Sequence, residues 1–137
     1  MHHFPKGERL KSRKKILALL NGGNVTKAGP IKIIWSTEPD AINGENKEAI
    51  QTAFSVPKRK FKKAVKRNRI RRKMKEIFRL NKQPLTEHLY RHQFKLNLLV
   101  IYLSGKDMPY KQIEKHLLKA LDTILENLKY ENINKYK

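Results

Sequence analysis

Lysine and arginine dominate one short stretch of the chain and set the chemistry it offers. Twelve of the eighteen residues at positions 58–75 are Lys or Arg, and none is Asp or Glu. Guanidinium groups donate paired hydrogen bonds to phosphate, and ammonium groups add less directional charge. So dense a block repels itself unless a polyanion neutralises it, which favours either a disordered arm or a nucleic-acid-binding face. The chemistry predicted here is recognition of phosphate rather than covalent catalysis.

Apolar residues within this stretch indicate that it is folded. Four of them follow the i, i+4, i+7, i+8 spacing of a helix face that packs on a core, namely Ile70, Met74, Ile77 and Phe78. A second apolar patch, one or two turns earlier, consists of Phe61, Ala64 and Val65. Pro57 marks the end of a preceding strand, because proline cannot donate to a sheet ladder. The pattern predicts a strand, a basic turn and a helix at about residues 62–80.

Two side chains on this helix do not fit a merely solvated charge. Arg67 lies three residues before Ile70 and seven before Met74, on the side of the apolar stripe. Asn68 stands between two arginines, although asparagine forms helices poorly and prefers caps and turns. The alternatives to a recognition role are an exposed basic helix without a specific partner and a membrane-surface helix, whose apolar face would carry more bulky aromatic residues.

The composition agrees with a single basic domain. The chain has 137 residues, enough for one modest two-layer core, and a formal net charge of +20. Such a charge requires a polyanionic partner or strong screening by salt, and RNA or DNA is the favoured partner. Cysteine is absent, which excludes disulfides and thiolate metal sites and suits a reducing cytosol. We expect neither a signal peptide nor a membrane span, because no apolar run is long enough.

Acidic residues and histidines are too scattered to predict an active site on the protein. Hard cations such as Mg²⁺ need clustered oxygen ligands, and Glu76 is the only acid in the sequence near the basic helix. Its spacing from Lys73 and Arg79 is that of a helical ion pair. His88 and His92 share helical spacing and would need a third ligand to hold a metal. We therefore expect no metal site and no catalytic group on the protein.

The first half of the chain predicts one helix and two strands. Leucine and isoleucine recur within residues 9–21, with Ser12 as a candidate N-cap and Gly22-Gly23 as the end. The β-branched run at residues 31–36 predicts a strand. Residues 37–47 are acidic and rich in turn formers, which predicts a hairpin loop, and residues 50–56 predict the strand after it.

The second half predicts a connector, a central strand and a long helix. Residues 81–93 contain Pro84 and mixed polarity, which indicates a connector with at most a helical turn. Residues 94–103 are almost continuously apolar, as in a buried strand. Pro109 suits the first turn of a helix, whose core face is Ile113, Leu117, Ala120, Leu121, Ile124 and Leu128. Within one domain spanning residues 1–137, residues 1–8 and 129–137 are expected to be loosely ordered tails.

The basic helix resembles the signature of a known family. Residues 64–72, Ala-Val-Lys-Arg-Asn-Arg-Ile-Arg-Arg, resemble the Arg-Asn-Arg motif, followed by Ile and two basic residues, of the protein component of bacterial ribonuclease P. Residues 54–59 are similar to that family's strand ending in Ser-Val-x-Lys-Lys. Phe4-Pro5-Lys6 and Arg9-Leu10 match its opening Phe and Arg-Leu pattern. The resemblance extends from about Phe4 to Leu128, and its central motif is long and specific.

The order of elements predicts an α+β domain of two layers, with helices packed against a mostly antiparallel sheet. The resemblance implies about four strands and three helices in it, as in the second domain of a small-subunit ribosomal protein. It also implies an accessory subunit of an endoribonuclease, a hydrolase whose catalytic groups are on RNA. That RNA removes the 5′ leader of precursor tRNA, using Mg²⁺ held mainly by the RNA. The implied partners are ribonuclease P RNA and precursor tRNA in the cytoplasm, without an obligate protein partner or a membrane.

Two other functions remain open at this point. A ribosomal or other structural RNA-binding protein fits the charge and the order of elements equally well. Asn68 within its frame of arginines favours the ribonuclease P resemblance, since a binder of ribosomal RNA needs charge but not this arrangement. A protein endonuclease is the third alternative, and the missing carboxylate cluster argues against it.

The resemblance also implies which residues bind RNA. Those that match or flank the motif are Lys58, Arg59, Lys63, Lys66, Arg67, Asn68, Arg69, Arg71 and Arg72. Arg67, Asn68 and Arg71 are expected nearest to the active region of the RNA. A cleft between the first helix and the sheet is expected to take the leader, with the candidates Arg9, Ile16, Leu20, Trp35 and Phe54. Ile16 and Leu20 stand where many members have Phe, so this cleft would rest on aliphatic packing plus Trp35; alternatively these three residues belong to the core.

Overall fold

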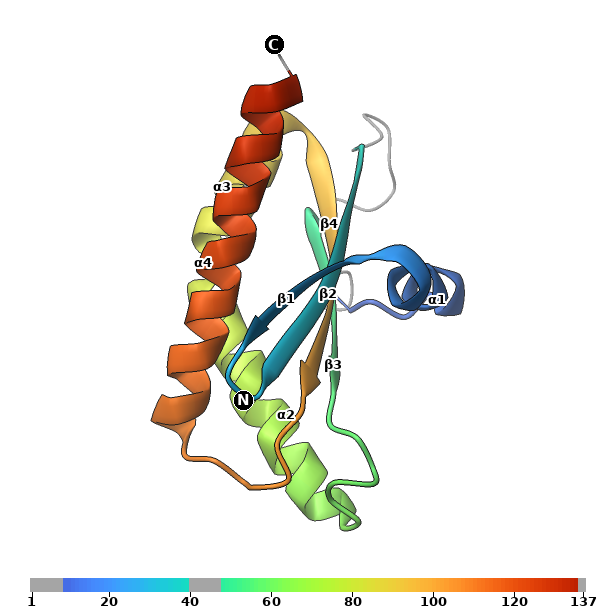
Figure 1. The fold of residues 1–137 in the computed structure, drawn as a ribbon, viewed down its shortest axis with the longest axis vertical. Coiled ribbons are helices and arrows are strands. Elements are labelled where there is room, and N and C mark those ends of the chain that lie inside the picture. The colour runs from blue at the N-terminus through green and yellow to red at the C-terminus, as the bar shows by residue number, and fades with distance from the viewer. Residues whose placement is uncertain (1–8, 40–47, 136–137) are drawn as a thin grey trace.

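The chain forms a four-stranded sheet with helices on both of its faces (Figure 1). The computed structural model describes residues 9–39 and 48–135. The elements, in chain order, are α1 (Arg13–Gly22), β1 (Asn24–Ala28), β2 (Ile31–Pro39), β3 (Ile50–Ser55), α2 (Ala64–Asn81), α3 (Gln83–His92), β4 (Phe94–Tyr102) and α4 (Tyr110–Lys135). The α+β class is confirmed, with four helices in the described ranges where three were expected.

The last strand of the chain lies inside the sheet, whose order is β1-β2-β4-β3. β4 pairs antiparallel with β2 and parallel with β3, and β1 pairs antiparallel with β2. The mostly antiparallel sheet and its apolar central strand are thereby confirmed. The predicted hairpin between β2 and β3 is wrong, because β4, with its nearly continuous apolar sequence, is buried between them. Residues 40–47 of that loop lie outside the described residues.

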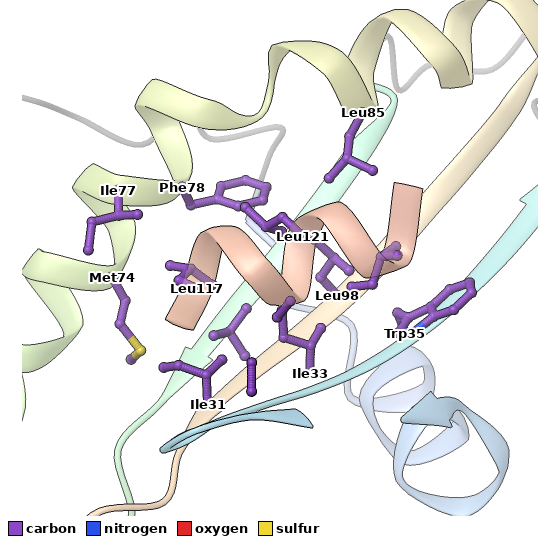
Figure 2. Packing of buried hydrophobic residues seen from close by; sticks show 14 of the residues in the cluster. Ile31, Ile33, Trp35, Met74, Ile77, Phe78, Leu85, Leu98, Leu117 and Leu121 are labelled. Carbon is purple, nitrogen blue, oxygen red and sulfur yellow. The ribbon is translucent and has the colours of Figure 1, made fainter. Parts of the chain in front are cut away.

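α2, α3 and α4 cover one face of the sheet (Figure 1). The predicted stripe of α2 is buried there, since Ile70, Met74 and Ile77 are 0% exposed. Figure 2 shows residues of α2 and α4 meeting those of β2 and β4 in one core, and each such buried side chain contributes about 1.5–3 kcal/mol. Of the second apolar patch only Phe61 is buried, whereas Val65 is 66% exposed, because the start of α2 lies beyond the ends of the strands (Figure 1).

α1 covers the opposite face, where a smaller apolar cluster contains Leu10, Leu19, Ile34 and Leu99. Ser12 is the N-cap as predicted, and its Oγ accepts a hydrogen bond from the Lys15 amide at 3.3 Å. The helix ends at the two predicted glycines. A Cβ at Gly23 would come within 2.7 Å of the Cγ2 atom of Ile34, so a larger residue there would push α1 away from β2.

β1 is a strand that was not expected from the sequence. It joins β2 through Gly29 and Pro30, with Ala28 paired to Ile31. Gly29 has a φ angle of +56°, and a Cβ there would collide with Nδ1 of His116 on α4. Glycine meets both demands, because it adopts left-handed backbone angles without strain and brings no side chain into contact.

Two further segments are more helical than expected. The predicted connector is largely α3, because Pro84 falls in the first turn, where its missing N–H breaks no helical bond. Leu85 and Leu89 of α3 are buried in the core and account for this fourth helix. α4 continues to Lys135, so residues 129–135 are helical where a loose tail was expected. The other expected tail, residues 1–8, lies outside the described residues.

Candidate nucleic-acid interface

The side of α2 that points away from the core carries most of the predicted RNA-binding side chains. Since the apolar stripe turns inward, the other positions face solvent, and the exposed residues of the predicted set on or just before α2 are Lys63, Lys66, Asn68, Arg69 and Arg72. Lys58 and Arg59 are exposed in the turn that precedes the helix. The first turn of α2 has no acidic residue and no side-chain cap, so the positive end of the helix dipole adds to the basic charge.

Arg67 is placed differently from its neighbours on α2. Its Nη1 atom donates to the carbonyl oxygen of Phe61 at 2.7 Å and to that of Lys62 at 2.9 Å. Phe61 is buried in turn, with its ring 6.2 Å from that of Tyr102. Charge-assisted hydrogen bonds of this kind are about twice as strong as neutral ones. Arg67 therefore fastens the basic turn to α2, a positioning role that the expectation of a direct RNA contact did not include.

An open hollow of about 320 Å³ on α2 is lined by Asn68, Arg71, Arg72 and Lys75. Nη1 of Arg71 donates to Oδ1 of Asn68 at 2.9 Å. This bond holds the guanidinium of Arg71 beside the hollow. Asn68 therefore orients a neighbouring cation, which a further Lys or Arg at this position could not do. The structure thus brings together three of the predicted RNA-binding residues with Lys75, which is not in the predicted set.

Arg9, near the start of the chain, brings a further positive charge to this region. The amide of Leu10 donates to the carbonyl oxygen of Thr52 at 3.0 Å, and Arg9 forms a parallel bridge with Thr52, so this segment lies along the outer edge of β3. Burial lowers the pKa of Lys75, and the charges of Arg9 and Arg71 lower it further. Cations gathered in this way favour the binding of an anion.

The acidic residues beside α2 are already paired. Asp107 accepts a hydrogen bond from Nζ of Lys73 at 2.9 Å and lies 3.4 Å from Nη1 of Arg69. The bond from Lys73 holds the pKa of the Asp107 carboxyl below its usual value. Glu76 pairs with Nη2 of Arg79 at 2.9 Å, as its spacing predicted. Neither carboxylate is among the residues that line the hollow.

The predicted leader cleft is not assembled as expected. Ile16 packs on the small cluster beneath α1, and Leu20 of the same helix is 54% exposed. Trp35 faces the main core on the other side of the sheet, where its Nε1 donates to Oγ1 of Thr26 at 3.1 Å. Phe54 points to that side too, and its ring lies 5.9 Å from the ring of Phe78. Trp35 and Phe54 thus lie on the face opposite α1, because alternate residues of a strand face opposite sides, and Trp35 takes the core position that was the alternative for it.

A row of polar side chains, missed in the sequence analysis, faces α1 instead. Ser36 of β2 and Gln51 of β3 both pair with Asn97 of the central strand. Glu38 extends the row, since it accepts from Nζ of Lys15 at 3.3 Å and from Nδ2 of Asn97 at 3.5 Å. One signal was present in the sequence, because Asn97 interrupts the apolar run of β4.

The two histidines with helical spacing lie together on α3. The ring centroids of His88 and His92 are 4.5 Å apart. Burial lowers the pKa of His88, and the nearby His92 and Lys129 lower it further. Among the side chains that the structure describes, no group of three or more His, Cys, Asp or Glu could hold a metal ion. No helix within the described ranges is long and apolar enough to cross a membrane.

Comparison with other sequences identifies relatives over most of the chain. A family model described as Ribonuclease P matches residues 4–125. The ribonuclease P protein component of Porphyromonas gingivalis is 28% identical over 124 residues, which cover 90% of this chain and 87% of the relative. That of Dictyoglomus thermophilum is 32% identical over 119 residues, which cover 85% of this chain and 87% of the relative.

Solved structures of RNase P proteins from other bacteria share the fold of this chain. The RNase P protein of Staphylococcus aureus superposes with a TM-score of 0.63 at 22% identity, over 85% of this chain and 94% of that chain. The RNase P protein of Thermotoga maritima superposes with a TM-score of 0.61 at 19% identity, over 82% of this chain and 93% of that chain. At these identities the likeness concerns the fold alone.

Proposed function

The chain belongs to the Ribonuclease P family, and from this membership we propose that it is the protein subunit of ribonuclease P. In this role it binds the catalytic RNA and the 5′ leader of precursor tRNA and assists the Mg²⁺-dependent hydrolysis that leaves the mature 5′ end. The observation that carries the proposal is the hollow on α2, where Asn68 orients Arg71 among further cations. A protein that bound RNA through positive charge alone would not need the side-chain amide of Asn68 at this position.

α2 and the turn before it bind the phosphates of the RNA in this proposal. Each phosphate that a Lys or Arg neutralises releases counterions, so affinity falls steeply as salt rises. The contacting residues are Lys58, Arg59, Lys63, Lys66, Asn68, Arg69, Arg71 and Arg72, together with Lys75 and Arg9 near the hollow. Arg67 acts behind this surface, because it holds the basic turn against the start of the helix.

The catalytic groups belong to the RNA. A protein site for Mg²⁺ needs several free oxygen ligands, and the acids beside α2 are engaged by cations, Asp107 by Lys73 and Glu76 by Arg79. These residues do not fit a Mg²⁺ site, and the ions are held mainly by the RNA. The part of the protein is electrostatic: its cations reduce the repulsion between RNA backbones, and so reduce the Mg²⁺ that assembly and cleavage require.

The leader crosses the α1 side of the sheet. α1 covers this face, whereas α2, α3 and α4 cover the other (Figure 1). Exposed Leu20 and half-buried Ile16 offer aliphatic surface, and the rings of Trp35 and Phe54 lie behind the sheet, where they contribute no stacking. The grip on the leader therefore rests on aliphatic packing and on polar groups.

Since precursor tRNA is the substrate, the protein works in the cytoplasm.

Cleavage of a precursor tRNA at limiting Mg²⁺ tests the proposal. The rate is measured for the protein alone, for the ribonuclease P RNA of the source organism alone, and for both together. We expect a product with a mature 5′ end to form much faster when both are present. Arg72→Ala should reduce this stimulation, whereas Lys119→Ala, the same loss of charge at an exposed position of α4, should not.

Cleavage by the protein without RNA would overturn the proposal. Tight, salt-sensitive binding of RNA without any stimulation of cleavage would instead indicate a structural RNA-binding protein, such as a ribosomal protein.

A further inference from the structure

The two flanks of α2 differ in charge. One of them, the Lys73 flank, carries Arg69, Lys73 and Glu76, because residues three or four apart are neighbours on a helix. Asp107 reaches this flank from the loop between β4 and α4, which passes beside α2 (Figure 1). Since a helix has 3.6 residues per turn, Arg71 projects about 160° away from Lys73, on the flank that holds the hollow. The hollow is lined by an amide and three cations, whereas the Lys73 flank combines cations with carboxylates.

The loop that carries Asp107 is anchored on both sides of that residue. Tyr102, fully buried at the end of β4, donates its hydroxyl hydrogen to the carbonyl oxygen of Lys106 and accepts from the amide of Met108 at 3.2 Å. Nζ of Lys73 donates to the carbonyl oxygen of Met108 at 3.1 Å. These bonds fix the backbone around Asp107 without help from its carboxylate. The carboxylate is therefore held beside α2 before any RNA arrives.

Asp107 divides its two oxygens between two cations of α2. Oδ1 accepts from Nζ of Lys73 at 2.9 Å, and Oδ2 accepts from Nη1 of Arg69 at 3.4 Å. Lys73 thus uses two of its three N–H donors on the loop, and its side chain is only 23% exposed. Arg69 is 55% exposed and uses one of its five donors on Asp107, so it keeps donors for a phosphate. The carboxylate withdraws Lys73 from RNA and leaves Arg69 at the border.

Stability alone does not account for this carboxylate. An ion pair that is partly open to solvent contributes little to folding, and Tyr102 already anchors the loop. A carboxylate beside an RNA-binding helix also repels phosphate, a cost that a neutral residue at this position would avoid. Groups that repel the wrong partner are, however, one of the two means by which a protein gains specificity. The position of Asp107 suits this second means.

We propose that Asp107 is a specificity-determining residue of the RNA-binding surface, and that it keeps the RNA backbone on the flank of the hollow by repelling phosphates from the Lys73 flank. The inference rests on the proposed function and adds how the basic helix distinguishes its own RNA from other polyanions. An RNA whose shape places its phosphates at the hollow meets cations and the Asn68 amide. A duplex that lies across the Lys73 flank brings phosphates against the carboxylate, and Coulomb repulsion weakens that contact.

Binding of the full chain to two RNAs tests this inference. Filter binding gives the Kd for the ribonuclease P RNA of the source organism and for an RNA duplex of unrelated sequence. The salt series is centred on physiological ionic strength, where exposed charges more than about 8 Å apart are largely screened from each other. The proteins compared are the wild type, Asp107→Asn, Asp107→Glu and Asp122→Asn. Asp122 is exposed on α4, so this control variant undergoes the same change of net charge away from α2.

We expect Asp107→Asn to tighten binding of the unrelated duplex on the order of fivefold, because the repulsion is removed and the Lys73 flank accepts a phosphate. The slope of log Kd against log salt should steepen by about 0.9 for this duplex, the contribution of one phosphate. The Kd for ribonuclease P RNA should change less than about twofold, since its backbone lies on the other flank. Asp107→Glu, which restores a carboxylate, and Asp122→Asn should both keep the wild-type ratio of the two Kd values.

Asparagine keeps an oxygen that can accept from Lys73, so Asp107→Asn should fold, which its thermal unfolding checks. If it does not fold, Asp107→Ser takes its place and should show the same loss of discrimination between the two RNAs.

A ratio of Kd values that stays unchanged in the folded variant, or an equal change in binding of both RNAs, would overturn the inference and leave the proposed function standing. A wild-type protein that does not stimulate cleavage of precursor tRNA by the ribonuclease P RNA would overturn the proposed function, and the inference with it.

Discussion

Replacing Arg67 with alanine separates positioning from contact on the basic helix. Nη1 of Arg67 donates to two backbone carbonyl oxygens, at 2.7 Å and 2.9 Å, and thereby closes the turn before α2. Arg72 lies on the same helix, is exposed and lines the hollow. The two alanine variants remove the same charge, so a difference between them reports on structural role rather than on net charge.

The magnitude follows from the environment of the two bonds. A hydrogen bond to a charged group contributes about 1.5–3 kcal/mol when it is shielded from water. The Arg67 side chain is half-buried, and one of the two acceptors, the Lys62 carbonyl, is exposed to solvent. We therefore add the lower values for the two bonds and reduce the total for solvent screening. Arg67→Ala should lower the free energy of unfolding by about 2 kcal/mol and Tm by roughly 8 °C. Arg72→Ala should change the free energy of unfolding by less than about 0.5 kcal/mol.

RNA binding should show the reverse order. Arg72→Ala should reduce the slope of log Kd against log salt by roughly 0.7–0.9, the contribution of one phosphate. Arg67→Ala should leave that slope unchanged, although a looser turn weakens binding at every salt concentration. Arg67→Lys is the matched variant, because it keeps the charge but lacks the planar fork, and it should retain the slope and lose part of the stability.

Urea unfolding followed by circular dichroism, in chloride buffer at fixed ionic strength, measures the first quantity, and filter binding across a salt series measures the second. If Arg67→Ala keeps wild-type stability and loses the salt slope of one phosphate, then Arg67 is a phosphate contact and its role in closing the turn is refuted.

Three further predictions concern the hollow, the β1–β2 turn and α3. Lys75→Ala should reduce the salt slope of RNA binding as Arg72→Ala does, since both line one hollow, and an unchanged slope would remove Lys75 from the interface. Gly29→Ala should lower the free energy of unfolding by about 3 kcal/mol, because it adds left-handed backbone strain and a collision with His116. The double variant Gly29→Ala/His116→Ala should recover only the stability lost to the collision. Full recovery of stability would contradict the contribution from backbone strain. The folded-state pKa of His88 is lowered, so the unfolded chain binds the proton more readily, and stability should fall as pH drops below about 6.5. Urea unfolding across neutral and mildly acidic pH should show a smaller loss for His88→Gln, and an equal loss would assign the effect to other groups.

The basic helix could be predicted because burial leaves a periodic trace in the sequence. Ile70, Met74 and Ile77 recur at helical spacing even where most of their neighbours are charged. The same holds for β4, whose nearly continuous apolar residues indicate a strand covered on both faces. In each case the information lies within one segment, so local pattern suffices.

The side of the sheet that Trp35 faces could not be predicted from the local sequence pattern. Ile33, Ile34 and Trp35 are all apolar, because helices cover both sides of β2, and the alternation that would sort them is hidden. The partners of Arg67 are backbone carbonyls, which leave no signature in residue types. The position of β4 between β2 and β3 depends on pairing between distant segments, and no local pattern reports it.

The place of β4 in the sheet also governs how this chain is made. When synthesis has reached the end of α3, β2 has only β1 beside it among the described strands, and β3 has not yet met its neighbour in the sheet. The dense positive charge of α2 is by then complete, while its apolar stripe still lacks most of the surface it will pack on. Folding must wait for a late strand that joins both halves, a non-local step that is intrinsically slow. The nascent subunit is thus a cationic, incompletely folded polymer at the ribosome, and a chain cut short before β4 has no smaller sheet in which to place β3.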